Sequence, residues 1–260
     1  MKLKDPLYVK DFLKEGIRFD GRKFDEFRKV EIETGVSENA EGSARVKLGN
    51  SDVISGVKLE IDRPFPDTPD KGIIIINAEF CPFSFEDFDQ EDIREKEVEL
   101  ARVVDRAIRS SGMVSLEELC VKKGEEVWKI IVDNYILNHD GNLIDLLTLS
   151  TVVALLNTRF PRLENGKIIH EERTDKKLPI TGIPLNITIA KVDSNYLVDP
   201  TRIEEETADC LLTVGIKDNK ICSLQKRGKG GLTDDEIKKI IELAIEKYKE
   251  LRKVVENSTH

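Results

Sequence analysis

The order of strand-like and helix-like segments constrains the fold of this chain more than any single motif. The first half opens with segments rich in β-branched residues, at 28–34, 43–48, 53–61 and 73–80. The last of these is apolar on both faces, which predicts a central strand. The second half opens in the same way, with strand-like segments at 185–192, 195–198, 208–216 and 220–224. Because helix-like sequence follows the strands in each half, we predict an α+β fold with two subdomains, each a β-sheet with helices.

The spacing of apolar residues predicts where the first helices lie. Val98, Ala101, Val104 and Ile108 recur at three- and four-residue steps up to Gly112. This pattern is typical of an amphipathic helix that packs the stripe on a core and stops at a glycine. Three further elements follow, a strand, a turn and a largely buried helix, at 127–137, 139–141 and 142–157.

The final helix has the clearest start signal in the chain. Thr233 and Glu236 have the spacing of a capping box, and Asp234 and Asp235 favour the positive end of a helix. The residues that follow form one apolar stripe, made of Ile237, Ile240, Ile241, Ala244, Ile245, Tyr248 and Leu251. Between 216 and 220, Asp218 and Asn219 predict a hairpin turn that joins the last two strands.

A polar stretch separates the two halves. Charged residues dominate 162–177, and Gly166, Pro179 and Pro184 lie in or after this stretch. Such residues are typical of connections between structural units. We therefore predict an N-terminal subdomain, a connecting segment and a C-terminal subdomain, at 1–160, 161–184 and 185–260.

The charge balance limits how this chain contacts nucleic acid. Its 260 residues include 41 basic and 50 acidic side chains, for a net charge of −9, whereas a protein that binds nucleic acid with its whole surface is normally basic. Any RNA contact must therefore be local, or shared with a more basic partner. No apolar run approaches the roughly 18 residues of a membrane span, and the start lacks the apolar core of a signal peptide. We expect a cytoplasmic protein without a membrane partner.

Potential metal ligands are few and scattered. The cysteines and histidines are Cys81, Cys120, Cys210, Cys222, His139, His170 and His260. The cysteines form no C-x-x-C pair, which predicts reduced, mostly buried thiols rather than a zinc site or a disulfide framework. The histidines do not cluster as metal ligands normally do. We therefore expect no metal site and no other cofactor.

Two polar clusters allow more than one interpretation. Gly228, Gly230 and Gly231 lie beside Lys226, Arg227 and Lys229 and could bind a phosphate. Their spacing matches neither a P-loop nor a dinucleotide fingerprint, so we favour a flexible turn before the final helix. The acidic stretch 199–206 could supply a general acid or a magnesium ligand. Charge runs more often form solvated faces, and on residue chemistry alone we favour a solvated face here.

Arg102 and Arg106 lie four residues apart on the helix that ends at Gly112, and therefore share one face. Like charges at this spacing cost about 0.2–0.5 kcal/mol unless negative charge lies nearby. Glu99 and Asp105 could supply that charge and produce an ion-paired surface, the more common arrangement. The alternative is a phosphate clamp, because the arginine fork matches phosphate oxygens bidentately.

Short motifs recur in a fixed order over most of residues 16–245. They are GIRFDGR at 16–22 followed by Arg28, GSARVKLG at 42–49, KLEIDRP at 58–64, ELARVVDR at 99–106, VDPT at 198–201 with Glu204 and Glu205, and QKRGKG at 225–230. In order and spacing this series resembles the RNase PH family, and within it the non-catalytic ring subunit of the archaeal exosome.

This resemblance implies an RNase PH-like fold (ribosomal protein S5 domain 2-like) and a place in a hexameric ring of three heterodimers. In such a ring a catalytic RNase PH-like subunit alternates with the non-catalytic one, and RNA-binding cap subunits lie on one face. The ring degrades single-stranded RNA from its 3′ end with inorganic phosphate. Arg102 and Arg106 match arginines that reach across the interface to RNA in the partner's active site. For these two residues the resemblance favours the phosphate clamp.

The same resemblance argues against catalysis by this chain alone. The catalytic relatives carry a G-S-R or G-T-R triplet at the turn into the buried helix, and its donors hold the attacking phosphate. Here the matching residues are Gly141, Asn142 and Leu143, so the arginine is absent. A phosphate dianion would lose its charge-assisted donors. We therefore assign no catalytic residue and expect no enzymatic activity from the chain by itself.

An alternative stays open at this point. Asp199 and Glu205 leave acids near where the catalytic relatives carry theirs. A phosphate arginine could also come from elsewhere in the chain, for instance Arg45 or Arg109. The chain would then be a phosphorolytic exoribonuclease or nucleotidyltransferase active by itself.

Overall fold

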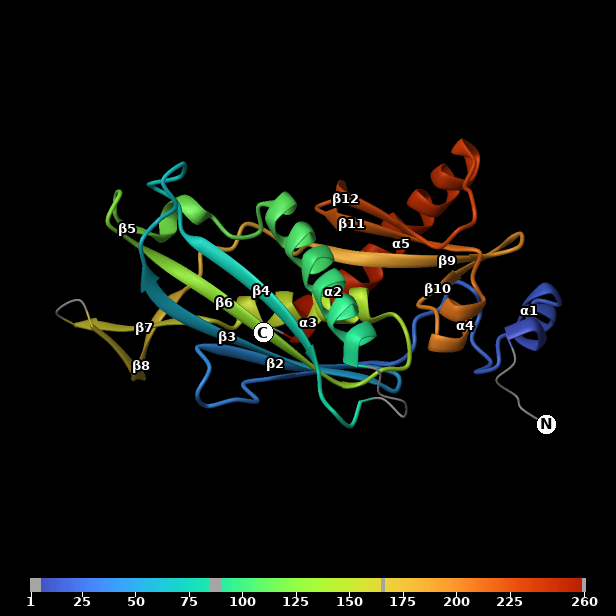
Figure 1. The fold of residues 1–260 in the computed structure, drawn as a ribbon, viewed down its shortest axis with the longest axis horizontal. Coiled ribbons are helices and arrows are strands. Elements are labelled where there is room, and N and C mark those ends of the chain that lie inside the picture. Colours follow the sequence, from blue (N-terminus) through green and yellow to red (C-terminus); the bar gives the residue numbers. More distant parts are fainter. Residues whose placement is uncertain (1–5, 85–89, 165–166, 259–260) are drawn as a thin grey trace.

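Alternating burial along the first strands builds the larger of two main sheets. The computed structural model describes residues 6–84, 90–164 and 167–258. Along β2 (Gly42–Leu48) and β3 (Ser51–Asp62), every second residue is buried against the core after the first three residues of each strand. The strand order is β1-β2-β3-β6-β4, with β5 added to β6 (Figure 1). The other strands of this sheet are β1 (Val30–Thr34), β4 (Ile73–Phe80), β5 (Cys120–Lys122) and β6 (Glu126–Asn138).

β4 lies at an edge of this sheet, so the prediction of a central strand was wrong. Among the described strands it pairs only with β6, in parallel. Ile74 and Ile76 are buried in the core beside α2 (Gln90–Ser111), whereas Ile75 is 39% exposed on the other face. An apolar run predicts that a strand is largely buried, but it does not show how many strands pair with it.

The second sheet follows the predicted segments closely. It has the order β10-β9-β11-β12. Its strands are β9 (Leu185–Val192), β10 (Asn195–Val198), β11 (Cys210–Lys217) and β12 (Lys220–Arg227). Asp218 and Asn219, between β11 and β12, have φ of 49° and 61°. Positive φ at both central residues is the signature of a tight hairpin turn, which confirms the predicted hairpin.

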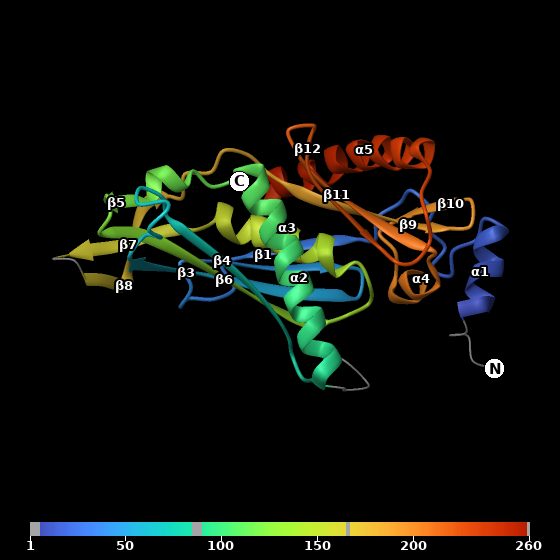
Figure 2. The same ribbon diagram turned by 45° about the horizontal axis from the view of Figure 1, so that its top comes forward.

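The central helix α3 (Leu143–Leu156) is buried because it lies between the two sheets (Figures 1 and 2). It packs against β2 and β3 on one side and against β9 on the other. All residues from 143 to 155 are buried. Most of its side chains are apolar on every face, as is typical of a helix in the core of a large protein. The prediction of a largely buried helix is therefore confirmed, and its first turn is fixed by both sheets.

The face of α2 that packs on the core differs from the predicted one. Val98 is 52% exposed, whereas Leu100, Val103 and Val104 are buried. The true stripe runs through Leu100, Val103, Val104, Ala107 and Ile108. The predicted stripe was therefore wrong at its start, because Val98 lies two residues, or roughly 200°, from Leu100 on the helix. The glycine stop is confirmed, since Gly112 has φ of 59°.

The last helix, α5 (Asp234–Ser258), begins as its sequence predicts. The Thr233 N–H donates to Glu236 Oε2 at 2.8 Å, and the Glu236 N–H donates to Thr233 Oγ1 at 3.3 Å. This reciprocal pair is a capping box. Ile240, Ala244 and Tyr248 of the predicted stripe are buried, and the helix packs on β9 and β11.

The remaining elements lie at the two ends of the molecule. The polar connecting segment forms an antiparallel hairpin of β7 (Arg159–Glu164) and β8 (Lys167–Lys177). At the opposite end, α1 (Pro6–Lys14) packs on α4 (Arg202–Thr207) (Figures 1 and 2). A short 3-10 turn, η1 (Leu116–Leu119), precedes β5. In the described part of the chain, no helix is long and apolar enough to cross a membrane.

Candidate functional site

A buried carboxylate, Asp199, ties the start of the chain to the second sheet. Its side chain is 0% exposed. Arg28 donates from Nε and Nη2 to its two oxygens at 2.8 and 2.7 Å, and Arg22 donates from Nη1 at 3.0 Å. The side-chain amide of Asn142, at the turn into α3, donates to it at 2.9 Å. These donors compensate a charge that would otherwise be very costly to bury.

A second buried ion pair lies close in sequence to the first. Arg18 donates from Nε and Nη2 to the two oxygens of Glu204 at 2.8 and 2.7 Å, with both side chains almost inaccessible. The solvated face that we favoured for 199–206 was therefore wrong for Asp199 and Glu204. Their partners lie in 18–28, far away along the chain, where no local pattern could reveal them. In this structure, these acids and arginines form buried ion pairs that hold residues 18–28 against the second sheet.

The turn into α3 places a carboxylate against the start of that helix. Gly141 has φ of 87°, and a Cβ there would come within 2.4 Å of backbone atoms of Thr201 and Arg202. The Asn142 N–H donates to Glu205 Oε1 at 3.1 Å. The start of a helix carries partial positive charge and attracts anions. Glu205 therefore fills an anion position with a carboxylate of the chain itself, and burial raises the pKa of that carboxyl group.

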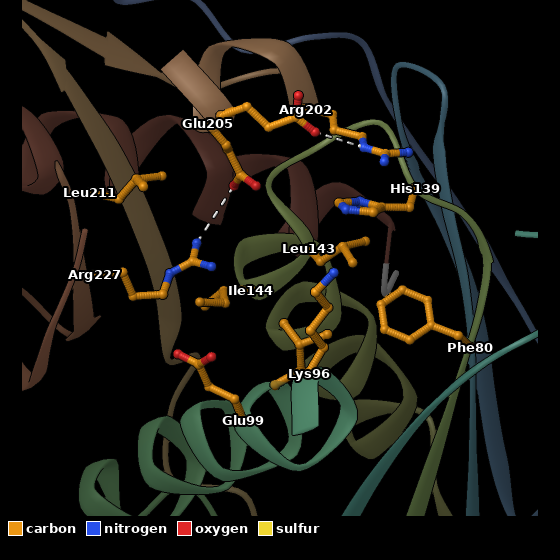
Figure 3. A pocket seen from close by; sticks show the side chains of 12 residues that line it. Phe80, Lys96, Glu99, His139, Leu143, Ile144, Arg202, Glu205, Leu211 and Arg227 are labelled. Atoms are coloured by element: carbon orange, nitrogen blue, oxygen red, sulfur yellow. Dashed lines mark hydrogen bonds and ion pairs between the residues drawn. The ribbon is translucent and has the colours of Figure 1, made fainter. Parts of the chain in front are cut away.

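A cavity of about 320 Å³ opens beside Glu205, and α2, α3, α4 and β12 contribute residues to its wall (Figure 3). Its charged lining residues are Lys96, Arg202, Arg227, Glu99, Glu205 and Glu206. Arg202 Nε donates to Glu206 Oε1 at 3.2 Å, and Arg227 Nη2 lies 3.6 Å from Glu205 Oε1. Positive and negative charges in the wall are therefore balanced in number, and the two arginines each face a carboxylate.

His139 lines the same cavity and is held neutral. Burial, followed by the charges of Arg202 and Lys96, lowers its pKa from 6.5 to about 4. The side chain of His170 and the whole of His260 lie outside the described residues. Where side chains are described, no three His, Cys, Asp or Glu residues are grouped so that they could hold a metal ion.

Arg102 and Arg106 lie exposed on one face of α2 and line a second cavity of about 580 Å³. The two cavities share Lys96 and Glu99. Arg106 Nη1 donates to Gln225 Oε1 at 2.8 Å. Within the described residues neither arginine forms an ion pair. Asp105 does not offset the positive charges of Arg102 and Arg106, because its carboxylate pairs with Arg109 at 2.7 Å.

The arginines that could have replaced the missing phosphate anchor are engaged elsewhere. Arg45 pairs with Asp52 at 2.7 Å, where β2 and β3 meet. Arg109 donates to the Ile74 carbonyl at 2.9 Å and pairs with Asp105. Neither lines the cavity at the turn into α3. Arg45 and Arg109 are therefore not placed to supply the phosphate arginine that the alternative of a chain active by itself requires.

The cavity cations were not singled out as a site from the sequence. Lys96 and Arg202 lie in charge-rich segments where no pattern distinguishes them. Arg227 was considered only as part of the glycine cluster, which forms the turn between β12 and α5. There Gly228, with φ of 86°, packs against the backbone of Asp209 and Cys210.

The cysteines are free, but the expectation that most are buried was wrong. Only Cys210 is buried, whereas Cys81, Cys120 and Cys222 are half-buried. Cys120 lies in β5 and Cys222 in β12, and each of these strands pairs with only one described neighbour. Strands at a sheet edge cover their residues less completely than central strands do.

The sequence and the fold were compared with protein-family models and with solved structures. Residues 26–161 match the model of 3′ exoribonuclease family domain 1, and residues 182–247 match that of domain 2. A solved structure described as the Archaeoglobus fulgidus exosome with RNA bound to the active site is 40% identical, with a TM-score of 0.87 over 95% of this chain and 96% of that one. Rice Rrp46, at 15% identity and a TM-score of 0.71, shares the fold. The fold is thus the RNase PH-like α+β fold.

Two curated archaeal relatives cover nearly the same length. The exosome complex component Rrp42 of Methanocella arvoryzae is 44% identical over 250 residues, which cover 96% of this chain and 94% of the relative. Its counterpart from Archaeoglobus fulgidus is 43% identical over 249 residues, with coverage of 94% and 93%. This chain belongs to the 3′ exoribonuclease family.

Proposed function

We propose that this chain is a non-catalytic ring subunit of an archaeal-type exosome. It alternates with a catalytic RNase PH-like partner in a hexameric ring of three heterodimers, with RNA-binding cap subunits on one face. In this ring it holds single-stranded RNA during phosphorolytic degradation from the 3′ end. The names of the relatives and the RNA-bound exosome structure support this assembly, because the matches cover almost the whole chain.

The position of Glu205 carries the non-catalytic part of the proposal. Phosphorolysis needs a bound phosphate dianion as its attacking group. At the turn into α3 the Asn142 N–H already bonds a carboxylate, and the triplet 141–143 contains no arginine. A second negative charge about 4 Å from a carboxylate would meet a repulsion of about 4 kcal/mol at an effective dielectric constant near 20. The site therefore disfavours phosphate.

Arg102 and Arg106 carry the RNA-binding part of the proposal. Both are exposed, share one helix face and line the same cavity, and no carboxylate among the described residues pairs with them. Guanidinium groups in this state are free to bind phosphate oxygens. Two local contacts of this kind are compatible with an acidic chain, because phosphate contacts position RNA without a basic surface as a whole.

Reversing both charges in the assembled ring tests this function. The R102E/R106E double variant should assemble, because neither side chain contributes to the buried stripe of α2. RNA affinity should fall, and the slope of log affinity against log salt should become shallower by about 0.7 for each lost phosphate contact. A K249E/K253E variant on the exposed face of α5 has the same charge change and spacing, and should bind RNA as the unmodified ring does.

Size-exclusion chromatography confirms assembly of both variants before RNA binding is measured. An intact R102E/R106E ring whose affinity and salt slope equal those of the K249E/K253E ring would show that this helix does not clamp RNA.

A further inference from the structure

The cavity beside Glu205 has the size and chemistry of a small-ligand site that the proposed function does not use. Its volume of about 320 Å³ lies at the lower end of the range typical of ligand pockets, roughly 300–1,000 Å³. Figure 3 shows that its charged side chains come from separate elements and converge on one space. Lys96 comes from α2, Arg202 from α4 and Arg227 from the end of β12.

One donor in this wall has no protein acceptor. Arg227 Nε is buried and has no hydrogen-bond partner among the described residues. Buried donors are almost always satisfied, so such a group indicates a missing acceptor. The Arg227 guanidinium faces Glu205 through Nη2 alone, at 3.6 Å, beyond hydrogen-bond distance. The Arg227 side chain as a whole is 28% exposed, so its guanidinium group is accessible to a ligand oxygen from the cavity.

The charge of the wall limits which anion fits. Lys96, Arg202 and Arg227 are matched in number by Glu99, Glu205 and Glu206. A dianion such as inorganic phosphate would be repelled by these acids. A singly charged phosphodiester, which leaves the rest of its nucleotide uncharged, meets much less repulsion. The cavity thus favours an internal nucleotide of a strand over free phosphate.

The uncharged part of the wall suits a nucleobase. The rings of Phe80 and His139 lie side by side, with centroids 6.1 Å apart, and His139 carries no charge at neutral pH. Leu143 lies beside His139, and Ile144 and Leu211 add apolar side chains further along the wall (Figure 3). Unstacked RNA bases bind to surfaces of this kind, where aromatic and apolar side chains replace the neighbouring base.

The cavity is continuous with the surface assigned to the RNA backbone. Both cavities include Lys96 and Glu99, and the second cavity is lined by Lys96 as well as by Arg102 and Arg106. The ten residue-to-residue steps from Lys96 to Arg106 rise about 15 Å along the helix axis. A strand held at Arg102 and Arg106 therefore reaches the cavity by following this helix.

We propose that the cavity takes up one nucleotide of the RNA strand whose backbone Arg102 and Arg106 bind. The base lies against Phe80 and His139, and the phosphodiester accepts from Arg227 and Lys96. This inference rests on the proposed function and adds a second contact for the same strand. In this proposal the cavity beside residues 141–143, which contain no phosphate-binding arginine, helps to hold RNA.

Photocrosslinking in the assembled ring tests the proposal. RNAs that carry 4-thiouridine at successive positions from the 3′ end are bound without inorganic phosphate, so that they are not degraded. Mass spectrometry should locate a cross-link on a peptide that contains Phe80 or His139, at a defined position of the RNA. The R227M variant keeps the apolar stem of the side chain and removes its donors. It should lose most of that cross-link, and RNA affinity should fall about tenfold, the equivalent of 1.4 kcal/mol.

K229M is the matched control, because Lys229 is exposed on the same loop and does not line the cavity. It removes one positive charge and should change affinity less than about twofold, a small electrostatic effect. Equal effects of R227M and K229M, together with no cross-link in the cavity, would overturn the proposal. If R102E/R106E still weakened RNA binding in that case, the proposed function would stand without it.

The dinucleotide uridylyl-3′,5′-uridine (UpU), whose one phosphodiester carries a single negative charge, separates the two possible sources of a nucleotide. Protection of the cavity cross-link by UpU, in rings where RNA also cross-links there, agrees with a nucleotide site on the RNA path. UpU binding that depends on Arg227, with no RNA cross-link in the cavity, would mean that the cavity holds a free small nucleotide instead, and would contradict the proposal.

Discussion

Two groups of arginines in this molecule differ in burial and in partners. Arg18 and Arg28 are buried, and each forms a bidentate pair with a carboxylate more than a hundred positions away in sequence. Arg102 and Arg106 are exposed, and no described carboxylate pairs with them. Both groups lie in segments that resemble one family. The difference teaches that an arginine in these segments is structural when it pairs with a buried acid, and we propose that it binds RNA phosphates when it has no such partner.

The largest expected effect comes from breaking a buried pair. The R28M variant should lower the free energy of unfolding by about 3–5 kcal/mol, because Asp199 would keep its buried charge and lose its main donor. Urea denaturation measures this change. Lys29 is exposed beside it, and its K29M variant should cost less than about 0.5 kcal/mol. Equal costs for the two variants would remove the contrast between buried and exposed cations.

This contrast also explains what could be predicted from sequence. The capping box of Thr233 and Glu236 was predictable because both partners lie within one turn of a helix. The burial of Glu204 was not, since its partner Arg18 lies 186 positions earlier. The edge position of β4 was missed for the same reason, because strand order depends on distant pairings. In the candidate site, spacing alone placed Arg102 and Arg106 on one face.

The buried network at the start of α3 predicts an unusual dependence of stability on pH. His139 has a folded pKa of about 4, below its ordinary 6.5, so its contribution is lost as pH falls through this range. Burial raises the pKa of Asp145 from 3.8 to about 7, so its neutral form stabilises the fold at low pH and this contribution is lost as pH rises toward 7. Each slope is limited to about 1.4 kcal/mol per pH unit.

Two variants separate these opposing contributions. H139N removes a contribution that rises with pH, so its stability should fall more steeply than that of the unmodified chain as pH rises from 4 to 6.5. D145N removes a contribution that falls with pH, so its stability should change in the opposite direction relative to the unmodified chain over the same interval. Thermal unfolding at several pH values measures both. Parallel curves for the two variants would show that the ionisation of these buried groups does not govern stability here.

The smallest effect is expected for an exposed arginine that does have a partner. Arg109 lies on α2, near Arg106, and pairs with Asp105 at 2.7 Å. The R109A variant should lose about 1 kcal/mol of stability or less, as surface ion pairs do. RNA affinity of the assembled ring should stay within about twofold, because a paired guanidinium has little free capacity for phosphate. A loss as large as that of R102E/R106E would mean that pairing does not distinguish these arginines.

Phosphate-dependent RNA degradation by the purified chain, alone and after assembly with a catalytic RNase PH-like partner, tests the central claim most directly. Single-stranded RNA is incubated with magnesium and inorganic phosphate, and released nucleoside diphosphates are measured. With Glu205 at the start of α3 and no arginine in the triplet 141–143, the chain alone should release none, and activity should appear only with the partner. Release by the chain alone at a rate comparable with that of the complex would contradict the account.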